Sequence, residues 1–166
     1  REAWKSEITI MQNVIATLND EKGQIIFEYD IPRLGKRIDV VLLYRGIIFC
    51  VEFKVGESKI LEGDIDQVLD YALDLKNFHK FSENNLIVPI LVATNYRNSS
   101  TDIRMSVYDD RVVNPLVTGE SGISNLISKI LEKYPNEPEV NPDWIISPYA
   151  PTPTIIEAAK TLYESH

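Results

Sequence analysis

Two apolar stretches joined by a short turn constrain the fold of this chain most. Residues 37–43 read Arg-Ile-Asp-Val-Val-Leu-Leu and residues 47–54 read Ile-Ile-Phe-Cys-Val-Glu-Phe-Lys, with a glycine in the turn between them. Runs rich in β-branched and aromatic residues that flank a glycine predict a hairpin of two strands. Both faces of each strand are apolar, which predicts a sheet covered by helices on both sides. One face is expected to carry Ile38, Val40, Leu42, Phe49, Val51 and Phe53, and the other Val41, Leu43, Ile48 and Cys50.

Two acids and a lysine interrupt these apolar runs. If Arg45-Gly46 forms a two-residue turn, counting back along the strands places Asp39 opposite Glu52. Two carboxylates across a ladder repel each other, and burying them is costly unless a cation or a proton lies between them. Lys54 lies two residues after Glu52 and therefore projects from the same face. These residue types in this pattern predict a divalent-metal site with an ammonium group beside it.

A second turn geometry stays open at this point. Gly46 can also supply the left-handed residue of a three-residue turn with a bulge, which shifts the strand pairing by one residue. Asp39 and Glu52 would then point to opposite faces unless a second irregularity compensated. The competing structural explanation is an ion cluster at the end of a strand, in which Lys54 only neutralises one acid.

The length and composition are those of one ordinary globular domain. The 166 residues are 44% apolar and 25% charged, which allows a substantial core. No apolar run approaches ~20 residues, so no membrane span is predicted. With a single cysteine and no internal disulfide, we expect a cytoplasmic protein. The net charge of −8 argues against tight independent binding to nucleic acid, because phosphate contacts need a basic surface.

Hydrophobic periodicity predicts the other elements. Residues 4–18 form an amphipathic pattern with Trp4, Met11 and Ile15 on the inner stripe and Glu7 at its margin. With strands buried on both faces, the element order predicts an α/β domain, a three-layer α/β/α sandwich around a central mixed sheet. The further expected elements are a strand over 24–31, a helix over 64–78 capped by Asp64, a strand over 86–94, short strands within 105–116, and helices over 122–134 and 155–163.

The order of the polar motifs resembles the PD-(D/E)XK nuclease superfamily. The motifs are Asp39, then Glu52-x-Lys54 on the next strand, then Gln67-x-x-x-Tyr71 on the following helix. The last motif looks like that of the RecB-like branch. The resemblance covers about residues 1–135 and implies a restriction-endonuclease-like fold.

The resemblance also implies a role for each residue. Asp39 and Glu52 would ligate Mg²⁺ or Mn²⁺, with the backbone carbonyl of Phe53 as a further ligand. Glu7, from the first helix, is a looser match that would complete the metal shell or orient a water. Lys54 would hold the attacking water and stabilise charge on the scissile phosphate. The implied activity is a metal-dependent nuclease that hydrolyses phosphodiester bonds of nucleic acid. DNA is the substrate we favour, and the sequence leaves RNA open.

The resemblance extends to residues that would contact nucleic acid. Gln67 and Tyr71 lie one helical turn apart and share a face, from which they would touch the nucleic-acid backbone or hydrogen-bond the catalytic groups. Lys36 and Arg37 are weaker candidates for phosphate contacts, and a solvated turn is the competing explanation for both. One departure from the superfamily pattern is Ile38, which stands where the name of the superfamily has a proline.

The proline-rich segment carries a second, more local resemblance. Residues 144–159 look like the segment that joins such a domain to a helicase-like P-loop ATPase in large bacterial proteins related to Schlafen-type helicases. This implies a nuclease-like domain over 1–135, and over 136–166 a linker with the start of a helicase-like region. No phosphate-binding Gly-x-x-x-x-Gly-Lys-Ser/Thr occurs in the chain. The competing functions are a catalytically silent module that binds nucleic acid or docks the motor, and a pure protein-interaction domain.

Overall fold

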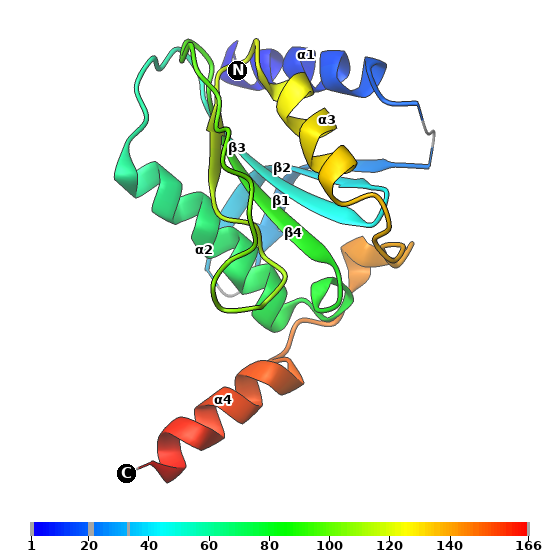
Figure 1. Cartoon of the computed structure of the whole chain (residues 1–166), viewed down its shortest axis with the longest axis vertical. Coiled ribbons are helices and arrows are strands. Elements are labelled where there is room, and N and C mark those ends of the chain that lie inside the picture. Colours follow the sequence, from blue (N-terminus) through cyan, green and yellow to red (C-terminus); the bar gives the residue numbers. More distant parts are fainter. Residues whose placement is uncertain (1, 20–21, 33, 166) are drawn as a thin grey trace.

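The computed structural model describes residues 2–19, 22–32 and 34–165 (Figure 1). It has a mixed α/β fold with the predicted order of elements, in which a helix and three strands precede a helix, a strand and a smaller strand–helix unit. In this part of the chain no helix is long and apolar enough to cross a membrane. The elements are α1 (Glu2–Ala16), β1 (Gln24–Ile31), β2 (Lys36–Tyr44), β3 (Ile47–Lys54), α2 (Glu62–Phe78), η1 (Lys80–Ser82), β4 (Leu86–Ala93), β5 (Leu116–Thr118), α3 (Ile123–Lys133), η2 (Trp144–Ile146) and α4 (Pro153–Glu164).

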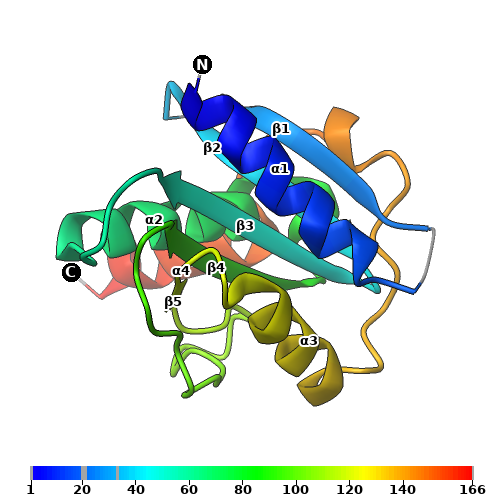
Figure 2. The same cartoon turned by 90° about the horizontal axis from the view of Figure 1, so that it is seen from above.

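The five strands form one mixed sheet in the order β1-β2-β3-β4-β5. The first three strands are antiparallel, whereas β4 runs parallel to β3 and β5 parallel to β4. Helix α2 makes the crossover between the parallel strands β3 and β4, as parallel pairing requires. One hydrophobic cluster joins one face of the sheet to α1 and α3, and a second joins the opposite face to α2 (Figure 2).

The hairpin between β2 and β3 has the two-residue turn. Tyr44 pairs with Ile47, and the turn residues Arg45 and Gly46 both have positive φ angles, of 48° and 80°. Positive φ at both central positions is the type I′ geometry that matches the twist of a hairpin. A Cβ atom on Gly46 would lie 2.3 Å from the carbonyl oxygen of Pro138, so only glycine fits there. The two-residue turn is therefore the one adopted, and its register would bring the two acids to one level, one step beyond the last pair of Val40 with Val51.

The alternation of faces breaks at one point, and the expected position of Ile38 is wrong. Val40 packs in the cluster with α1 and α3, whereas Ile38, two residues earlier, packs in the cluster with α2. The pairing of β1 with β2 skips one level here, between Phe27↔Val40 and Tyr29↔Ile38, and Glu28 at that level has a φ of 52°. This left-handed residue bends the paired strands, so side chains on either side of it exchange faces.

Helix α1 turns a different stripe to the sheet from the one expected. Met11 and Val14 are buried, but Trp4 and Ile15, which the periodicity places inside, are 47% and 41% exposed. The buried stripe consists of Ile10, Met11 and Val14, which lie on one face of the helix. Glu7, four residues before Met11, is half-buried at the margin of this stripe, as expected.

The proline-rich segment is packed against the sheet unit. Trp144 is fully buried in the cluster with α2, and its indole N–H donates to Ser82 Oγ at 2.8 Å. The side-chain amide of Asn85 donates to the carbonyl oxygen of Pro138 at 2.9 Å. The N–H of Thr152 donates to the end of α2, and α4 then projects away from the body (Figure 1). The domain boundary at residue 135 stays a prediction, but the packing of the body continues to about residue 152.

Candidate active site

The two acids come together where the ladder between β2 and β3 ends. Regular pairing stops at Val40 and Val51, and one more step would place Asp39 opposite Glu52. There the backbone N–H of Phe53 donates to Asp39 Oδ2 at 2.8 Å. The Asp39 carboxylate thus takes the place of the backbone carbonyl that would accept this bond in a regular ladder. Phe53, whose carbonyl is a predicted metal ligand, is thus fixed at the site through its own amide. The end of the ladder holds the Asp39 side chain toward β3.

Glu52 is the most buried acid of this group. Its side chain is part of a residue only 6% exposed, and Oε1 has no hydrogen-bond partner among the described residues. Burial raises the pKa of Glu52 to about 8, and the charge of Asp39 and a hydrogen bond with it add to the rise, while Lys54 opposes it. Without a cation, the folded protein therefore keeps a proton on Glu52 at neutral pH.

Glu7 reaches the same place from α1. The pKa of Glu7 is raised to about 7, first by burial and then by the charge of Asp39 and a hydrogen bond with Asp39. Helix α1 packs on one face of the sheet, whereas Glu52, two residues after Cys50 on β3, points with it to the other face. Asp39 lies at the bend between these faces. This position explains how one carboxylate interacts with acids that approach from both sides.

The ammonium group of Lys54 lies at the edge of the acid group. Its Nζ is 3.9 Å from Glu52 Oε2 and 3.7 Å from Asp64 Oδ1. The expectation that Asp64 caps α2 is wrong, because the helix begins two residues earlier and Leu61 is its N-cap without a side-chain bond. Asp64 is a residue of this site that sequence reasoning missed. The only signal was its place at the start of the helix after Lys54, which several registers of the helix would satisfy.

Of the predicted pair on α2, Tyr71 lies beside the acids. Tyr71 is 2% exposed, and its pKa is raised to about 12 by burial and then by the charges of Glu52 and Asp39. Its hydroxyl therefore stays protonated near the two carboxylates. Gln67 and Lys36 line one cavity of about 270 Å³ together with Tyr71.

Arg37 lies apart from this cavity. Its guanidinium is exposed and pairs with two acids of β1, at 2.9 Å from Asp30 Oδ1 and 3.9 Å from Glu28 Oε2. A surface pair of this kind contributes little to stability. Lys36 lines the same cavity as Gln67 and Tyr71, whereas Arg37, the next residue of β2, pairs with acids of β1.

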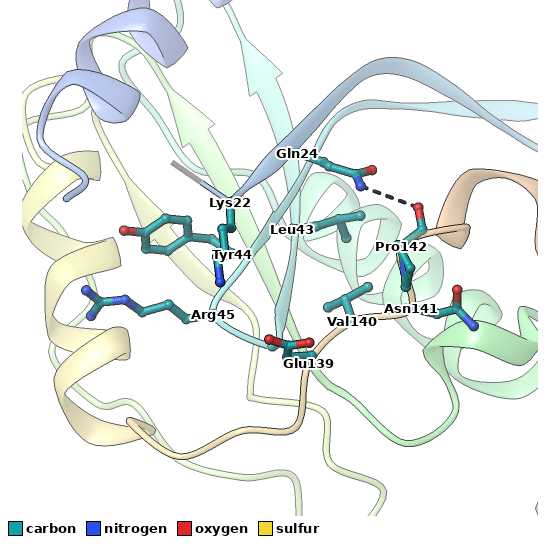
Figure 3. Close-up of a pocket in the computed structure, with 10 residues that line it drawn as sticks. Lys22, Gln24, Leu43, Tyr44, Arg45, Glu139, Val140, Asn141 and Pro142 are labelled. Carbon is teal, nitrogen blue, oxygen red and sulfur yellow. Dashed lines mark hydrogen bonds between the residues drawn. The ribbon is translucent and has the colours of Figure 1, made fainter. Parts of the chain in front are cut away.

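A second cavity of about 220 Å³ lies at the other end of the hairpin, next to its turn (Figure 3). Arg45 and Glu139 contribute opposite charges to its lining. The side-chain amide of Gln24 donates to the carbonyl oxygen of Pro142 across it at 3.4 Å. None of the predicted site residues lines this cavity. The acids lie at the opposite end of the hairpin, near the start of β2 and the end of β3.

The residues at the acid group suit a hard divalent cation that keeps most of its water. In the described ranges, no group of three or more His, Cys, Asp or Glu side chains is arranged to hold a metal ion. Mg²⁺ in proteins is usually bound by only one or two carboxylates, with waters in its other positions. Asp39 and Glu52 supply two carboxylates, and the unpartnered buried Oε1 of Glu52 is an oxygen that a cation would satisfy. The acid group therefore suits a divalent cation that is bound by two carboxylates.

Comparisons of the chain with protein-family models, with curated proteins and with solved structures found no match.

Proposed function

We propose that this chain is a metal-dependent nuclease module that hydrolyses phosphodiester bonds of nucleic acid, with DNA as the preferred substrate. The observation that carries the proposal is the meeting of Asp39 and Glu52 in a largely buried position, with Lys54 Nζ 3.9 Å from Glu52. An acid group of this kind, with pKa values raised first by burial and then by mutual repulsion, is typical of catalytic and cation-binding sites. Its place at the end of the hairpin, beside Tyr71, agrees with the motif order of the PD-(D/E)XK superfamily.

Each residue has a defined task in the proposed reaction. Asp39 and Glu52 would hold Mg²⁺ or Mn²⁺, which supplies positive charge to the phosphate and favours ionisation of a water at neutral pH. In hydrolysis, a water oxygen forms a bond to phosphorus, one ester bond from phosphorus breaks, and the leaving oxygen acquires a proton. The ammonium of Lys54 orients the water and stabilises charge that develops on the phosphate. Glu7, which hydrogen-bonds Asp39, would complete the metal shell or orient a water.

The fold and the setting form part of the same proposal. Helices on opposite faces of a mixed sheet support a three-layer α/β/α sandwich of the restriction-endonuclease-like type. The cavity lined by Gln67 and Lys36 would contact the strand next to the cleaved phosphate. A cytoplasmic location and a helicase-like P-loop ATPase in the same polypeptide complete the proposal.

A cleavage assay tests this function. Labelled single- and double-stranded DNA and RNA are incubated with the protein and Mn²⁺ or Mg²⁺, with a chelator as the blank. We expect Glu52→Gln and Lys54→Ala each to lower the cleavage rate on the order of 10²–10³-fold, because each removes a charged group from the transition state. Glu62→Gln, at an exposed acid on α2, is the matched control and keeps the parent rate. Absence of cleavage by the folded parent under all these conditions would contradict the proposal.

One observation favours a second function, a catalytically silent module that docks another protein domain. Helix α4 projects from the body, and its apolar residues Ile156, Leu162 and Tyr163 are 48%, 69% and 85% exposed. An amphipathic helix with an uncovered apolar face is suited to a groove on a partner. If Mn²⁺ binds and nucleic acid is bound but never cut, the silent module becomes the better account.

A further inference from the structure

The ammonium group of Lys54 lies between carboxylates from two different elements. Glu52 belongs to β3 and Asp64 to the first turn of α2, at 3.9 Å and 3.7 Å from Nζ. Both distances are those of ion pairs and exceed hydrogen-bond length, so the ammonium lies between the two acids without a hydrogen bond to either. The side chain of Asp64 is 24% exposed and that of Lys54 32% exposed. This pair is thus partly shielded, unlike the open surface pair of Arg37.

The position of Asp64 is determined by the fold. The loop from β3 to α2 is tied to the residues after β4, because the N–H of Gly56 donates to Thr94 Oγ1 at 2.8 Å. The side-chain amide of Asn95 returns a bond to the carbonyl oxygen of Gly56 at 3.1 Å. Gly56 has a φ of 83°, which turns the chain sharply at this point. The loop therefore brings the first turn of α2 back beside the end of β3.

A divalent cation and the ammonium of Lys54 would compete for Glu52. Two positive charges near one carboxylate repel each other strongly in a partly buried place. A second acid on the far side of the ammonium reduces this repulsion. Its negative charge still pairs with the ammonium when Glu52 binds a cation. Asp64 is the acid in that place.

We infer that Asp64 is a positioning residue that holds the ammonium of Lys54 away from the cation position while keeping it beside the site. The inference rests on the proposed function, since it assumes a cation between Asp39 and Glu52. It assigns Asp64 to the same site as Lys54, although the residue makes no contact with the reacting atoms. Without Asp64, the ammonium would move toward Glu52 and oppose the cation.

Calorimetric titration with Mn²⁺ tests this inference without any need for turnover. We expect Asp64→Asn to weaken Mn²⁺ binding roughly three- to tenfold, because the ammonium then competes for Glu52. Asp64→Glu restores the carboxylate and should recover most of the affinity. Glu62→Gln removes an acid from the same first helical turn and should leave the affinity unchanged. Thermal unfolding of each variant without metal shows whether the fold is intact.

The outcomes separate the inference from the function. Equal Mn²⁺ affinity in Asp64→Asn and the parent, or equal weakening in Glu62→Gln, overturns the role of Asp64 while leaving the nuclease proposal standing. A parent that binds Mn²⁺ but cuts no substrate overturns the nuclease, and the affinities still decide the role of Asp64. If the folded parent binds no Mn²⁺, both are overturned. Where cleavage occurs, saturating Mn²⁺ should restore the rate of Asp64→Asn, because the defect lies in binding.

Discussion

Replacing the ionisable carboxyl of Glu52 by a neutral amide should make the protein without metal more stable at neutral pH. The pKa of Glu52 is about 8 in the folded protein, against 4.5 for an ordinary glutamate, so the folded state holds a proton that the unfolded chain has lost. Since the folded state then binds more protons, the free energy of unfolding falls as the pH rises from 4.5 toward 8. The raised pKa of Glu52 therefore lowers the free energy of unfolding by about 3 kcal/mol between pH 4.5 and pH 7. Glu52→Gln has no proton to lose and avoids this cost.

Urea denaturation of the parent and Glu52→Gln at several pH values measures this difference. We expect the two to have similar stability at pH 4, and the variant to be more stable by about 3 kcal/mol at pH 7. For a chain of this length that corresponds to a rise in Tm of roughly 10 °C. Saturating Mn²⁺ should stabilise the parent more than the variant, because the cation takes the place of the proton. Parallel pH profiles for both proteins would refute the conclusion that Glu52 is buried beside another acid.

Three further predictions follow from other contacts. Binding of Mn²⁺ at pH 7 should release about one proton, mostly from Glu52. The heat of binding measured by calorimetry should therefore differ between buffers of different ionisation enthalpy. A heat of binding that does not depend on the buffer would contradict this prediction. Trp144→Ala should lower the free energy of unfolding in urea by about 3–5 kcal/mol, because the side chain is fully buried, and a loss below about 1 kcal/mol would show that the segment is not part of the fold. Gly46→Ala should lower the thermal stability of the protein by more than Gly35→Ala. Both glycines have a positive φ, but only at Gly46 would an added Cβ clash with the backbone, at 2.3 Å from the Pro138 carbonyl oxygen. Equal losses of stability would argue against that contact.

The hairpin and its acids could be predicted because local chemistry decides them. A glycine after Arg45 permits the two-residue turn, and the turn then determines every pairing back to Val40 and Val51. Period-two counting along both strands brings Asp39 and Glu52 to one level of the sheet. The mixed α/β class and the order of the elements were predictable for the same reason, since the apolar periods are long and regular.

The bend beside the acids could not be predicted, because the residue that makes it gives no signal. Glu28 adopts a left-handed φ without being glycine or asparagine, and nothing in a strand pattern indicates such a residue. Ile38 therefore changes face, and Asp39 comes within reach of acids on both sides of the sheet. The buried stripe of α1 was misjudged for a related reason. Trp4 outweighs smaller residues in a hydrophobic pattern, although the fold leaves it 47% exposed.

Long-range packing explains the remaining differences. A segment with many prolines is typical of a linker, yet Trp144 inserts beside α2, where its indole N–H finds Ser82. The start of α2 depends on how the preceding loop is tied to Thr94, and no local rule contains that contact. Asp64 therefore looks like a helix cap in the sequence and faces Lys54 in the structure.

The central claim is that Asp39 and Glu52 together hold one divalent cation. A crystal soaked in Mn²⁺ and measured for anomalous scattering tests it directly, because the ion is located without any reference to activity. The claim predicts one strong anomalous peak bound by both carboxylates, and loss of that peak in Glu52→Gln. Contradiction would come from a crystal in which Mn²⁺ lies elsewhere, or in which the two carboxylates share only a proton at saturating Mn²⁺.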